Sequence, residues 1–395
     1  MISVDEAVAR IIKSFAALPP ERVGVADAYA RVLAQDVPAS SDQPPAPMSA
    51  MDGYAVRVSD ARAGAELSLV GEAPAGKPYS GKVGPGQAVR IFTGGVVPDG
   101  ADAVVIQEDA EAKPARVVIK EAPRVGENVR AQGLDFRKNE ILLKSGHRVS
   151  ARDMATLASA DLATVLVTRK PRIAIVATGD ELSRPGEPRK AGGIVASSTY
   201  ALQAMVRNWG GEPIDLGILP DAPEAFATLP ESTRGCDLIV TLGGASVGDH
   251  DLVQSALAPH GFALDFWRIA MRPGKPLIFG RLKETPLIGL PGNPVSAMVC
   301  AVLFLVPAIA AMLGANYAPN IVKARLAVSL KANGKRQDYI RAKLTRQGGV
   351  PTAEPFTLQD SSMQRIFAAA DGLIVRSIDA PAANAGDDVE MLLLD

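Results

Sequence analysis

The chain has 395 residues, of which 47% are hydrophobic, and its formal net charge is −1. This length predicts more than one domain, and the interspersed charges argue against a nucleic-acid-binding surface. With only two widely separated cysteines and three histidines, a disulfide framework or a zinc site is not expected.

The N-terminal segment predicts an amphipathic helix rather than a signal peptide. Ser3 to Glu6 forms a capping-box pattern, and apolar residues then recur at helical spacing over residues 4–15. We expect this helix to end near residues 19–20 and a second helix to cover residues 25–35. Residues 38–47 are rich in proline and should be extended.

From residue 48 to 137 the pattern predicts a small β-rich domain inserted into a larger unit. Short β-type runs alternate there with glycine and proline turns, at residues 54–56, 67–70, 89–92 and 103–106. Residues 141–168 return to strand-like and then helical character.

Residues 171–315 alternate strands with helices, which predicts a doubly wound, mainly parallel α/β sheet. The clearest helix covers residues 199–209 and is closed by Gly210 and Gly211. The expected strands are residues 172–177, 213–219, 237–242, 263–270 and 286–290.

The uncharged segment over residues 297–313 is expected to be a buried helix of a soluble, cytoplasmic protein. It is slightly short for a membrane span, contains Pro307 and lacks flanking cationic or tryptophan anchors. The following residues, 316–395, carry several short β segments and predict a separate C-terminal β domain.

Three glycine-bearing turns directly follow predicted strands of the sheet, beginning at Thr178, Gly243 and Pro291. Open α/β sheets bind ligands beside the carboxyl ends of their strands. Glycine lets backbone N–H groups approach an anion, and the start of a helix favours negative charge. Because two of these turns also carry carboxylates, we expect a phosphorylated ligand held with a divalent cation.

Acids near the first two turns are candidate metal ligands. Glu181 could bind a metal or activate water, whereas its neighbour Asp180 could simply cap a helix. Asp249 and Asp251 leave the same two alternatives open after the Gly-Gly turn.

Cations and a hydroxyl form a second group of candidates. Lys275 lies on a loop stiffened by two prolines, and Arg272 begins that loop. Ser296 lies at the start of the apolar helix, where unpaired N–H groups suit an oxyanion, although a plain capping turn is the alternative.

Together these segments resemble the molybdopterin molybdotransferases, the MoeA family, which includes the C-terminal domain of gephyrin. The matching stretches occur in family order at residues 49–54 (SAMDGY), 93–94 (TG), 178–182 (TGDEL), 243–248, 273–276 (PGKP) and 289–296 (GLPGNPVS). No single motif is specific, but the ordered set is. The smaller molybdopterin adenylyltransferases share the sheet-domain motifs but lack the SAMDGY insert and the C-terminal β domain.

The resemblance implies four domains: an elongated discontinuous domain (residues 1–47 with 138–170), the β-rich insert (48–137), a molybdopterin-binding α/β domain (171–315) and a β-barrel-like domain (316–395). It implies a homodimer in which the partner's insert completes the cleft. It implies a reaction that joins molybdate to adenylylated molybdopterin and releases AMP with Mg²⁺. Contacts with molybdopterin adenylyltransferase and recipient molybdoenzymes are further expectations.

Site residues follow from the resemblance by matching position. Catalytic residues are Asp52, Thr93, Glu181 and Asp251, of which Glu181 and Asp251 are also metal ligands. Pterin-nucleotide contacts are Asp180, Asp221, Gly243, Gly244, Ser246, Gly248, Pro291, Gly292, Asn293 and Pro294. The molybdate seat is Arg272, Lys275, Ser296, Arg341 and Ser361, and Asp135 matches a further family acid.

Three residues depart from the family pattern. Arg272 replaces a common lysine, Leu252 replaces an aromatic residue, and Asp360 adds a negative charge beside Ser361. Two alternatives to the transferase remain open: a molybdopterin adenylyltransferase that uses ATP, and a scaffold that binds the pterin or partner proteins without turnover.

Overall fold

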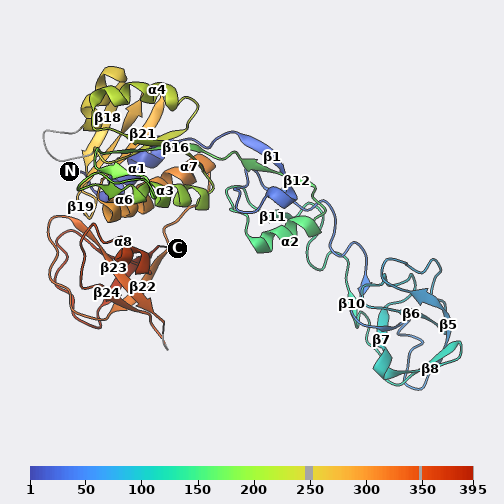
Figure 1. Cartoon of the computed structure of the whole chain (residues 1–395). Helices are drawn as coiled ribbons and strands as arrows, with labels where there is room; N and C mark the ends of the chain where they lie inside the picture. The colour runs from blue at the N-terminus through green and yellow to red at the C-terminus, as the bar shows by residue number, and fades with distance from the viewer. Residues whose placement is uncertain (245–251, 347–348, 395) are drawn as a thin grey trace.

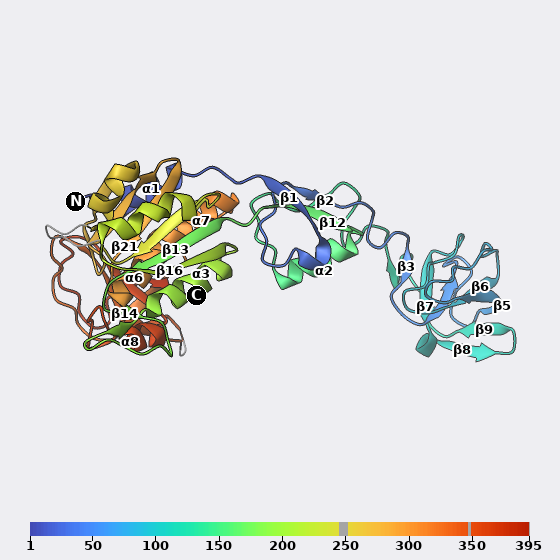
Figure 2. The same cartoon turned by 45° about the horizontal axis from the view of Figure 1, so that its top comes forward.

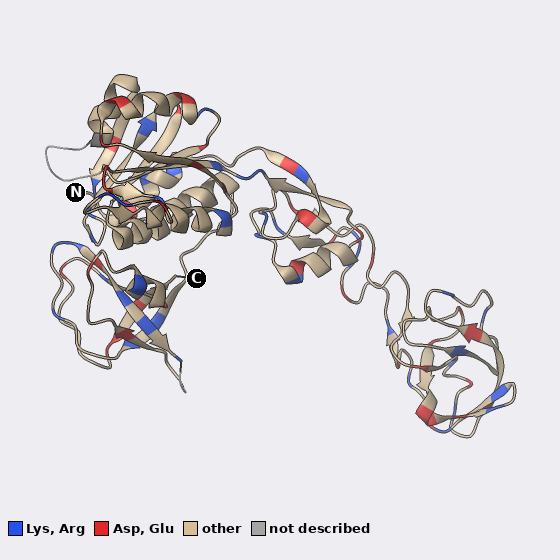
Figure 3. Ribbon diagram, in the orientation of Figure 1, with Lys and Arg blue, Asp and Glu red and all other residues tan. Residues whose placement is uncertain are grey.

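The computed structural model describes residues 1–244, 252–346 and 349–394 of an elongated chain (Figure 1). One end holds a central sheet with its helices and a C-terminal β-barrel. A narrow middle unit connects this end to a small β-rich unit at the far end, and the separation is equally clear in the turned view (Figure 2). Acidic and basic residues are interspersed along all of these parts (Figure 3).

The central sheet has six strands in the order β16-β13-β17-β21-β20-β18. Their bounds are β13 (Arg172–Thr178), β16 (Glu212–Leu219), β17 (Leu238–Leu242), β18 (Phe262–Arg268), β20 (Pro276–Leu282) and β21 (Thr285–Leu290). The first four strands in that order are parallel, and β20 is antiparallel to both of its neighbours. The predicted mainly parallel sheet is confirmed. The prediction omits β20, which begins at a proline, a residue that usually marks a turn.

Alternating side chains of β13 point into two hydrophobic cores on opposite faces of the sheet. Ile173 and Ile175 lie in one core, and Ala174 and Val176 lie in the other. The first core is covered by α1 (Val4–Lys13), α3 (Ser197–Asn208), α6 (Pro294–Cys300) and α7 (Val306–Leu313), and the second by η3 (Pro223–Thr228), α4 (Leu229–Ser232) and α5 (Leu252–Leu257). Helices therefore cover both faces, which confirms the doubly wound arrangement.

The apolar helix over Pro294–Leu313 combines α6, a π-helical segment (Ala301–Leu305) and α7. Its 20 residues and mean hydropathy of 2.5 would suit a membrane span by length and composition alone. However, 83% of its most apolar window is buried inside the protein. It is the core helix that the sequence predicts.

The middle unit brings together two distant stretches of the chain. β1 (Pro20–Gly24) pairs with β12 (Thr164–Thr168), and β2 (Val37–Pro38) pairs with β11 (Ile141–Leu143). The helix α2 (Ala151–Ser159) packs against this unit through Leu157.

Two helix predictions near the N-terminus are wrong. The helix expected over residues 25–35 is only a 3₁₀ turn at Val25–Asp27, because Val32 and Leu33 form β-bridges with Arg148 and Val167. The first helix ends at Lys13 rather than near residue 19. Beyond it the chain is held by α7 instead, where the N–H of Leu18 donates to the carbonyl of Met312 (2.8 Å).

The β-rich unit contains a six-stranded sheet in the order β7-β4-β6-β5-β9-β8. Its strands are β4 (Gly53–Val56), β5 (Glu66–Ala73), β6 (Gln87–Ile91), β7 (Ala103–Ile106), β8 (Ala110–Lys113) and β9 (Arg116–Ile119). The strand pair β3 (Met48–Ser49) and β10 (Val129–Arg130) lies where the chain enters and leaves this unit. All four predicted β runs are confirmed.

The C-terminal strands close into a barrel. They are β22 (Ile321–Leu326), β23 (Gln337–Thr345), β24 (Thr352–Pro355), β25 (Gly372–Arg376) and β26 (Asp388–Leu393). Closure follows because β23 pairs with both β24 and β25. A short strand after β18, β19 (Met271–Arg272), pairs with β23 and so attaches the barrel to the central sheet.

Candidate functional site

The carboxyl ends of neighbouring parallel strands open onto one cavity of about 720 Å³. β13 ends at Thr178, β17 at Leu242 and β21 at Leu290, and the turn after each strand reaches the cavity. The predicted site residues that line it are Glu181, Asp221, Gly243, Gly244, Pro291, Gly292, Asn293 and Pro294. Turns that are far apart in the sequence thus meet at the edge of the sheet where ligands are expected.

The glycines of the second turn are required by the backbone. Gly243 has φ +92°, and a Cβ there would lie 2.6 Å from the carbonyl oxygen of Thr178. Gly244 has φ +68°, and a Cβ would lie 2.6 Å from a methyl group of Val253. Because other residues would be strained and would clash, this turn depends on glycine to pass so close to β13.

Carboxylates gather at one side of the cavity. Burial, followed by the nearby charges of Glu181 and Asp180, raises the pKa of Asp221. The backbone N–H of Asp221 also donates to Oδ1 of Asp180 (3.4 Å). Carboxylates that repel one another in this way are suited to a divalent cation, which would relieve the repulsion.

No group of three or more potential metal ligands is arranged as a ready cage within the described ranges. Asp251, the other predicted ligand, lies outside the described residues, as do Ser246, Gly248 and Asp249. Asp180, Glu181 and Asp221 lie near enough to influence one another, and their carboxylate oxygens are donors of the kind that Mg²⁺ prefers.

Three residues predicted for the molybdate seat are brought together where the apolar helix meets the barrel. Ser296 is buried in the first turn of α6, and the N–H of its neighbour Val295 donates to the carbonyl of Ser361 (2.9 Å). Arg341, on β23, is 1% exposed. Its Nε donates to Gln359 (3.1 Å) and its Nη1 to the carbonyl of Asp360 (2.8 Å).

The buried guanidinium of Arg341 is thus held on two sides by the segment that carries Ser361. Burial lowers the pKa of Arg341, but an arginine remains charged at any physiological pH. Lys275 is half-buried and directly precedes Pro276, which lines the cavity. Lys275, Arg341, Ser296 and Ser361 carry cations and hydroxyls, the donors that a tetrahedral oxyanion needs, but none of them is among the residues that line the cavity.

Two of the departures from the family pattern have local partners. Arg272 forms an ion pair with Asp338 on β23. The carboxylate of Asp360 accepts hydrogen bonds from the backbone N–H and the hydroxyl of Ser362 (2.8 and 2.5 Å), which lower its pKa. The side chain of Leu252, the third departure, is outside the described part of the chain.

Asp52 and Thr93 lie together, but in the β-rich unit at the far end of the molecule (Figures 1 and 2). Both the N–H and the hydroxyl of Thr93 donate to Oδ1 of Asp52, each at 2.8 Å. These bonds lower the pKa of Asp52. Asp135 is exposed, and its N–H donates to the carbonyl of Gln43 (2.9 Å). Within one chain, none of these three residues reaches the sheet-edge cavity.

Further polar residues line the cavity but are absent from the predicted site. Ser197, Ser198 and Thr199 open α3, and Ser362 and Gln364 approach from the barrel. Nε2 of Gln364 donates to the hydroxyl of Ser197 (2.6 Å) and connects the two parts. The signal in the sequence is the Ser-Ser-Thr run before a helical pattern, which is typical of a helix start.

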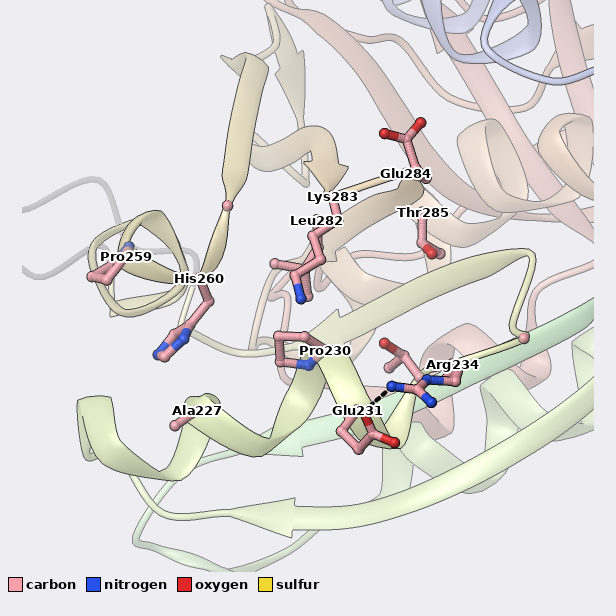
Figure 4. A pocket seen from close by; sticks show the side chains of 13 residues that line it. Ala227, Pro230, Glu231, Arg234, Pro259, His260, Leu282, Lys283, Glu284 and Thr285 are labelled. Atoms are coloured by element: carbon pink, nitrogen blue, oxygen red, sulfur yellow. Dashed lines mark hydrogen bonds and ion pairs between the residues drawn. The ribbon is translucent and has the colours of Figure 1, made fainter.

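A second cavity, of about 730 Å³, lies at the opposite end of the sheet strands. Arg234, His260 and Lys283 line it, and an ion pair of 2.5 Å joins Arg234 to Glu231 (Figure 4). None of the described residues predicted for the site lines this cavity, so the strand-end cavity remains the candidate site.

Three family models match successive parts of the chain. Residues 2–160 match the MoeA N-terminal region (domain I and II), residues 174–311 match a probable molybdopterin binding domain, and residues 323–394 match the MoeA C-terminal region (domain IV).

Relatives match over nearly full length. The molybdopterin molybdenumtransferase of Nostoc sp. is 37% identical and covers 93% of this chain and 87% of the relative. The Haemophilus influenzae enzyme of the same name is 32% identical and covers 98% of each. A crystal structure of the molybdopterin biosynthesis moeA protein of Pyrococcus horikoshii has a TM-score of 0.85 at 30% identity, and covers 100% of this chain and 99% of that one.

Proposed function

The chain belongs to the MoeA family of molybdopterin molybdenumtransferases, and we propose that its substrates are adenylylated molybdopterin and molybdate, with Mg²⁺-dependent release of AMP. Family membership makes it a transferase of molybdenum cofactor biosynthesis. The observation that supports the specific reaction is that acidic residues line the strand-end cavity, while a separate group of cations and hydroxyls lies where the apolar helix meets the barrel.

The acidic residues of the cavity suit the nucleotide end of the substrate. Glu181 and Asp221 would hold Mg²⁺, which supplies positive charge at the phosphates. The glycine turn at Gly243 allows a phosphate to approach the backbone closely. Without a cation the carboxylates would repel the phosphates, so AMP release should require both Mg²⁺ and the acids.

The group of cations and hydroxyls suits molybdate, a tetrahedral dianion. Lys275 and Arg341 supply charge, while Ser296 and Ser361 supply hydroxyl groups that can adjust their direction of donation. Placing molybdate beside the bound pterin would hold the oxyanion and the dithiolene together, which lowers the entropic cost of their reaction.

Asp52 and Thr93 would join this site from a second copy of the chain. They lie in the β-rich unit, remote from the cavity of their own chain (Figure 1). In a two-fold symmetric dimer each β-rich unit can approach the cavity of the partner, so two identical composite sites form. The partners proposed for this enzyme are therefore its own second copy, the adenylyltransferase that supplies the substrate and the molybdoenzymes that receive the product, all in the cytoplasm.

The test is AMP release by the purified chain supplied with adenylylated molybdopterin. We expect AMP to appear only when molybdate and Mg²⁺ are both present, and Glu181→Ala to lower its release by about 10²-fold. Glu187→Ala is the matched control, because Glu187 accepts only a local backbone bond from Arg184 (3.0 Å) among the described residues of the same loop. Pyrophosphate released from ATP would instead identify an adenylyltransferase, and tight pterin binding without either product would identify a scaffold.

A further inference from the structure

Arg272 and Asp338 join the central sheet to the barrel. They are register partners in the parallel pair β19–β23, and their side chains form an ion pair. The Asp338 side chain is only 7% exposed, whereas that of Arg272 is 60% exposed. The carboxylate is thus the buried member of the pair, and the guanidinium reaches it from the surface.

The second oxygen of this carboxylate has no other support. Oδ1 of Asp338 is buried and has no hydrogen-bond partner within residues 1–244, 252–346 and 349–394. A buried carboxylate needs a compensating charge or hydrogen bonds. Arg272 is therefore the group that makes this buried negative charge tolerable.

Each member of the pair lies three residues before a proposed ligand of molybdate. Lys275 follows Arg272 by three residues on the loop, and Arg341 follows Asp338 by three residues on β23. On the α6 side of the same loop, Gly274 has φ +104°, and a Cβ there would overlap Sγ of Cys300. The loop is therefore packed against α6 at Gly274 and tied to the barrel at Arg272.

We propose that Arg272 is a positioning residue that fixes the Lys275 loop to β23 through Asp338, and that it does not itself bind molybdate. The negative charge of the buried Asp338 carboxylate offsets the positive charge of the Arg272 guanidinium, which therefore attracts a second anion only weakly. Its planar geometry and fixed charge suit this task better than those of a lysine. The assignment replaces the role in molybdate binding that the family resemblance implies for Arg272.

A double-mutant cycle of Arg272→Ala, Asp338→Asn and both together tests this proposal by thermal unfolding and by the molybdate concentration that half-saturates AMP release. Each single change should raise half-saturation by about tenfold, and the double variant should be no worse than either single one. Arg272→Ala alone should unfold at a lower temperature than the double variant, because only the single variant leaves a charged, unpartnered carboxylate in the protein. Lys335→Ala is the matched control, since its ion pair with Asp379 on the same barrel is exposed.

Two results would overturn the proposal. One is an Asp338→Asn variant with normal half-saturation beside an impaired Arg272→Ala variant, since the guanidinium would then act on molybdate directly. The other is a double variant whose defects in half-saturation and unfolding temperature are the sums of the single ones. Only the activity arm rests on the proposed function. If Lys275→Ala also left half-saturation unchanged, the molybdate seat would be wrong, while the unfolding cycle would still decide whether the pair acts as one unit.

Discussion

The Asp52–Thr93 turn and the strand-end cavity hold carboxylates in opposite conditions. In the β-rich unit, Asp52 is partly exposed and receives two hydrogen bonds from Thr93, which lower its pKa. Asp221 lines the cavity but is largely exposed, and partial desolvation of its carboxyl group, followed by the neighbouring acids, raises its pKa. The first carboxylate is stabilised as an anion by hydrogen bonds within its own chain, whereas the second lies near other acids, whose repulsion a divalent cation would relieve.

The two regions also differ in whether one chain is enough to build them. The cavity has its shape within one chain, because it is built from turns after adjacent parallel strands. Asp52 is held rigidly but faces no cavity lined by the predicted ligand-binding residues of its own chain. This separation agrees with the proposed dimer, in which one chain would supply the cavity and the other would supply Asp52.

The largest expected effect comes from mixing two inactive variants. Asp52→Ala and Glu181→Ala should each lower AMP release by about 10²-fold, the scale of losing a catalytic acid–base or metal-site group. If each site combines Asp52 of one subunit with Glu181 of the other, a randomly mixed pair should recover about a quarter of wild-type activity, because half of the dimers carry one intact site. The measurement is AMP release after the subunits are dissociated and reassociated. An activity that stays at the level of the separate variants would show that both residues act within one chain.

The location of the cavity follows from the sequence for a simple physical reason. A glycine turn that directly follows an apolar strand fixes both the strand end and its backbone conformation, and adjacent parallel strands bring such ends together. Gly243 illustrates this, because it lies against the carbonyl of Thr178 at the end of a neighbouring strand. Pro291 follows Leu290, the register partner of Leu242, so the turn at Pro291 begins beside the turn at Gly243.

Contacts between distant segments do not follow from local patterns. The apolar spacing of residues 25–35 resembles a helix, yet Leu33 pairs with Val167, which local periodicity does not reveal. For the same reason, nothing near Arg272 in the sequence indicates that Asp338 neutralises it, or that Ser197 bonds to Gln364 across the cavity. The separation between Asp52 and the cavity likewise becomes visible only in three dimensions.

The proposed molybdate seat can be tested by removing one charge. Lys275→Ala should raise the molybdate concentration for half-saturation by about tenfold or more, because a charged hydrogen bond contributes about 1.5–3 kcal/mol. Excess molybdate should restore the rate, and affinity for adenylylated molybdopterin should stay nearly intact. Lys335→Ala, on the exposed barrel surface, should leave both quantities unchanged. Equal half-saturation in Lys275→Ala and the wild type would remove Lys275 from the seat.

The rigidity of the cavity can be tested at its glycine turn. Gly243→Ala combines a positive φ with an overlap on the carbonyl of Thr178, which should cost about 1–3 kcal/mol and weaken pterin-nucleotide binding. Gly186→Ala is the matched control, since Gly186 has φ +84° but nothing within 4 Å of its would-be Cβ. Thermal unfolding and nucleotide titration should show a larger loss for Gly243→Ala. Equal losses would mean that backbone strain, rather than contact with β13, determines the effect.

The smallest expected effect is a change in unfolding temperature when the charge of Asp52 or of Asp221 is removed. The sign of that change tests the comparison most directly. The pKa of Asp52 is lowered in the folded protein, so its charge adds stability above the ordinary pKa of 3.8, and this contribution is lost as the pH falls through the lowered value. The pKa of Asp221 is raised, so its ionisation opposes folding above that raised value, and the opposition disappears as the pH falls.

At neutral pH, with EDTA present, Asp52→Asn should therefore lower the unfolding temperature and Asp221→Asn should raise it. The Asp221 difference should disappear as the pH falls through its raised pKa toward the ordinary value of 3.8, whereas the Asp52 difference should persist until the pH falls through its lowered pKa. Adding Mg²⁺ should stabilise the wild type more than Asp221→Asn, because the cation turns the crowded carboxylate into a ligand. Shifts of the same sign in the two variants at neutral pH would contradict the distinction between a carboxylate satisfied by its own chain and one that awaits a cation.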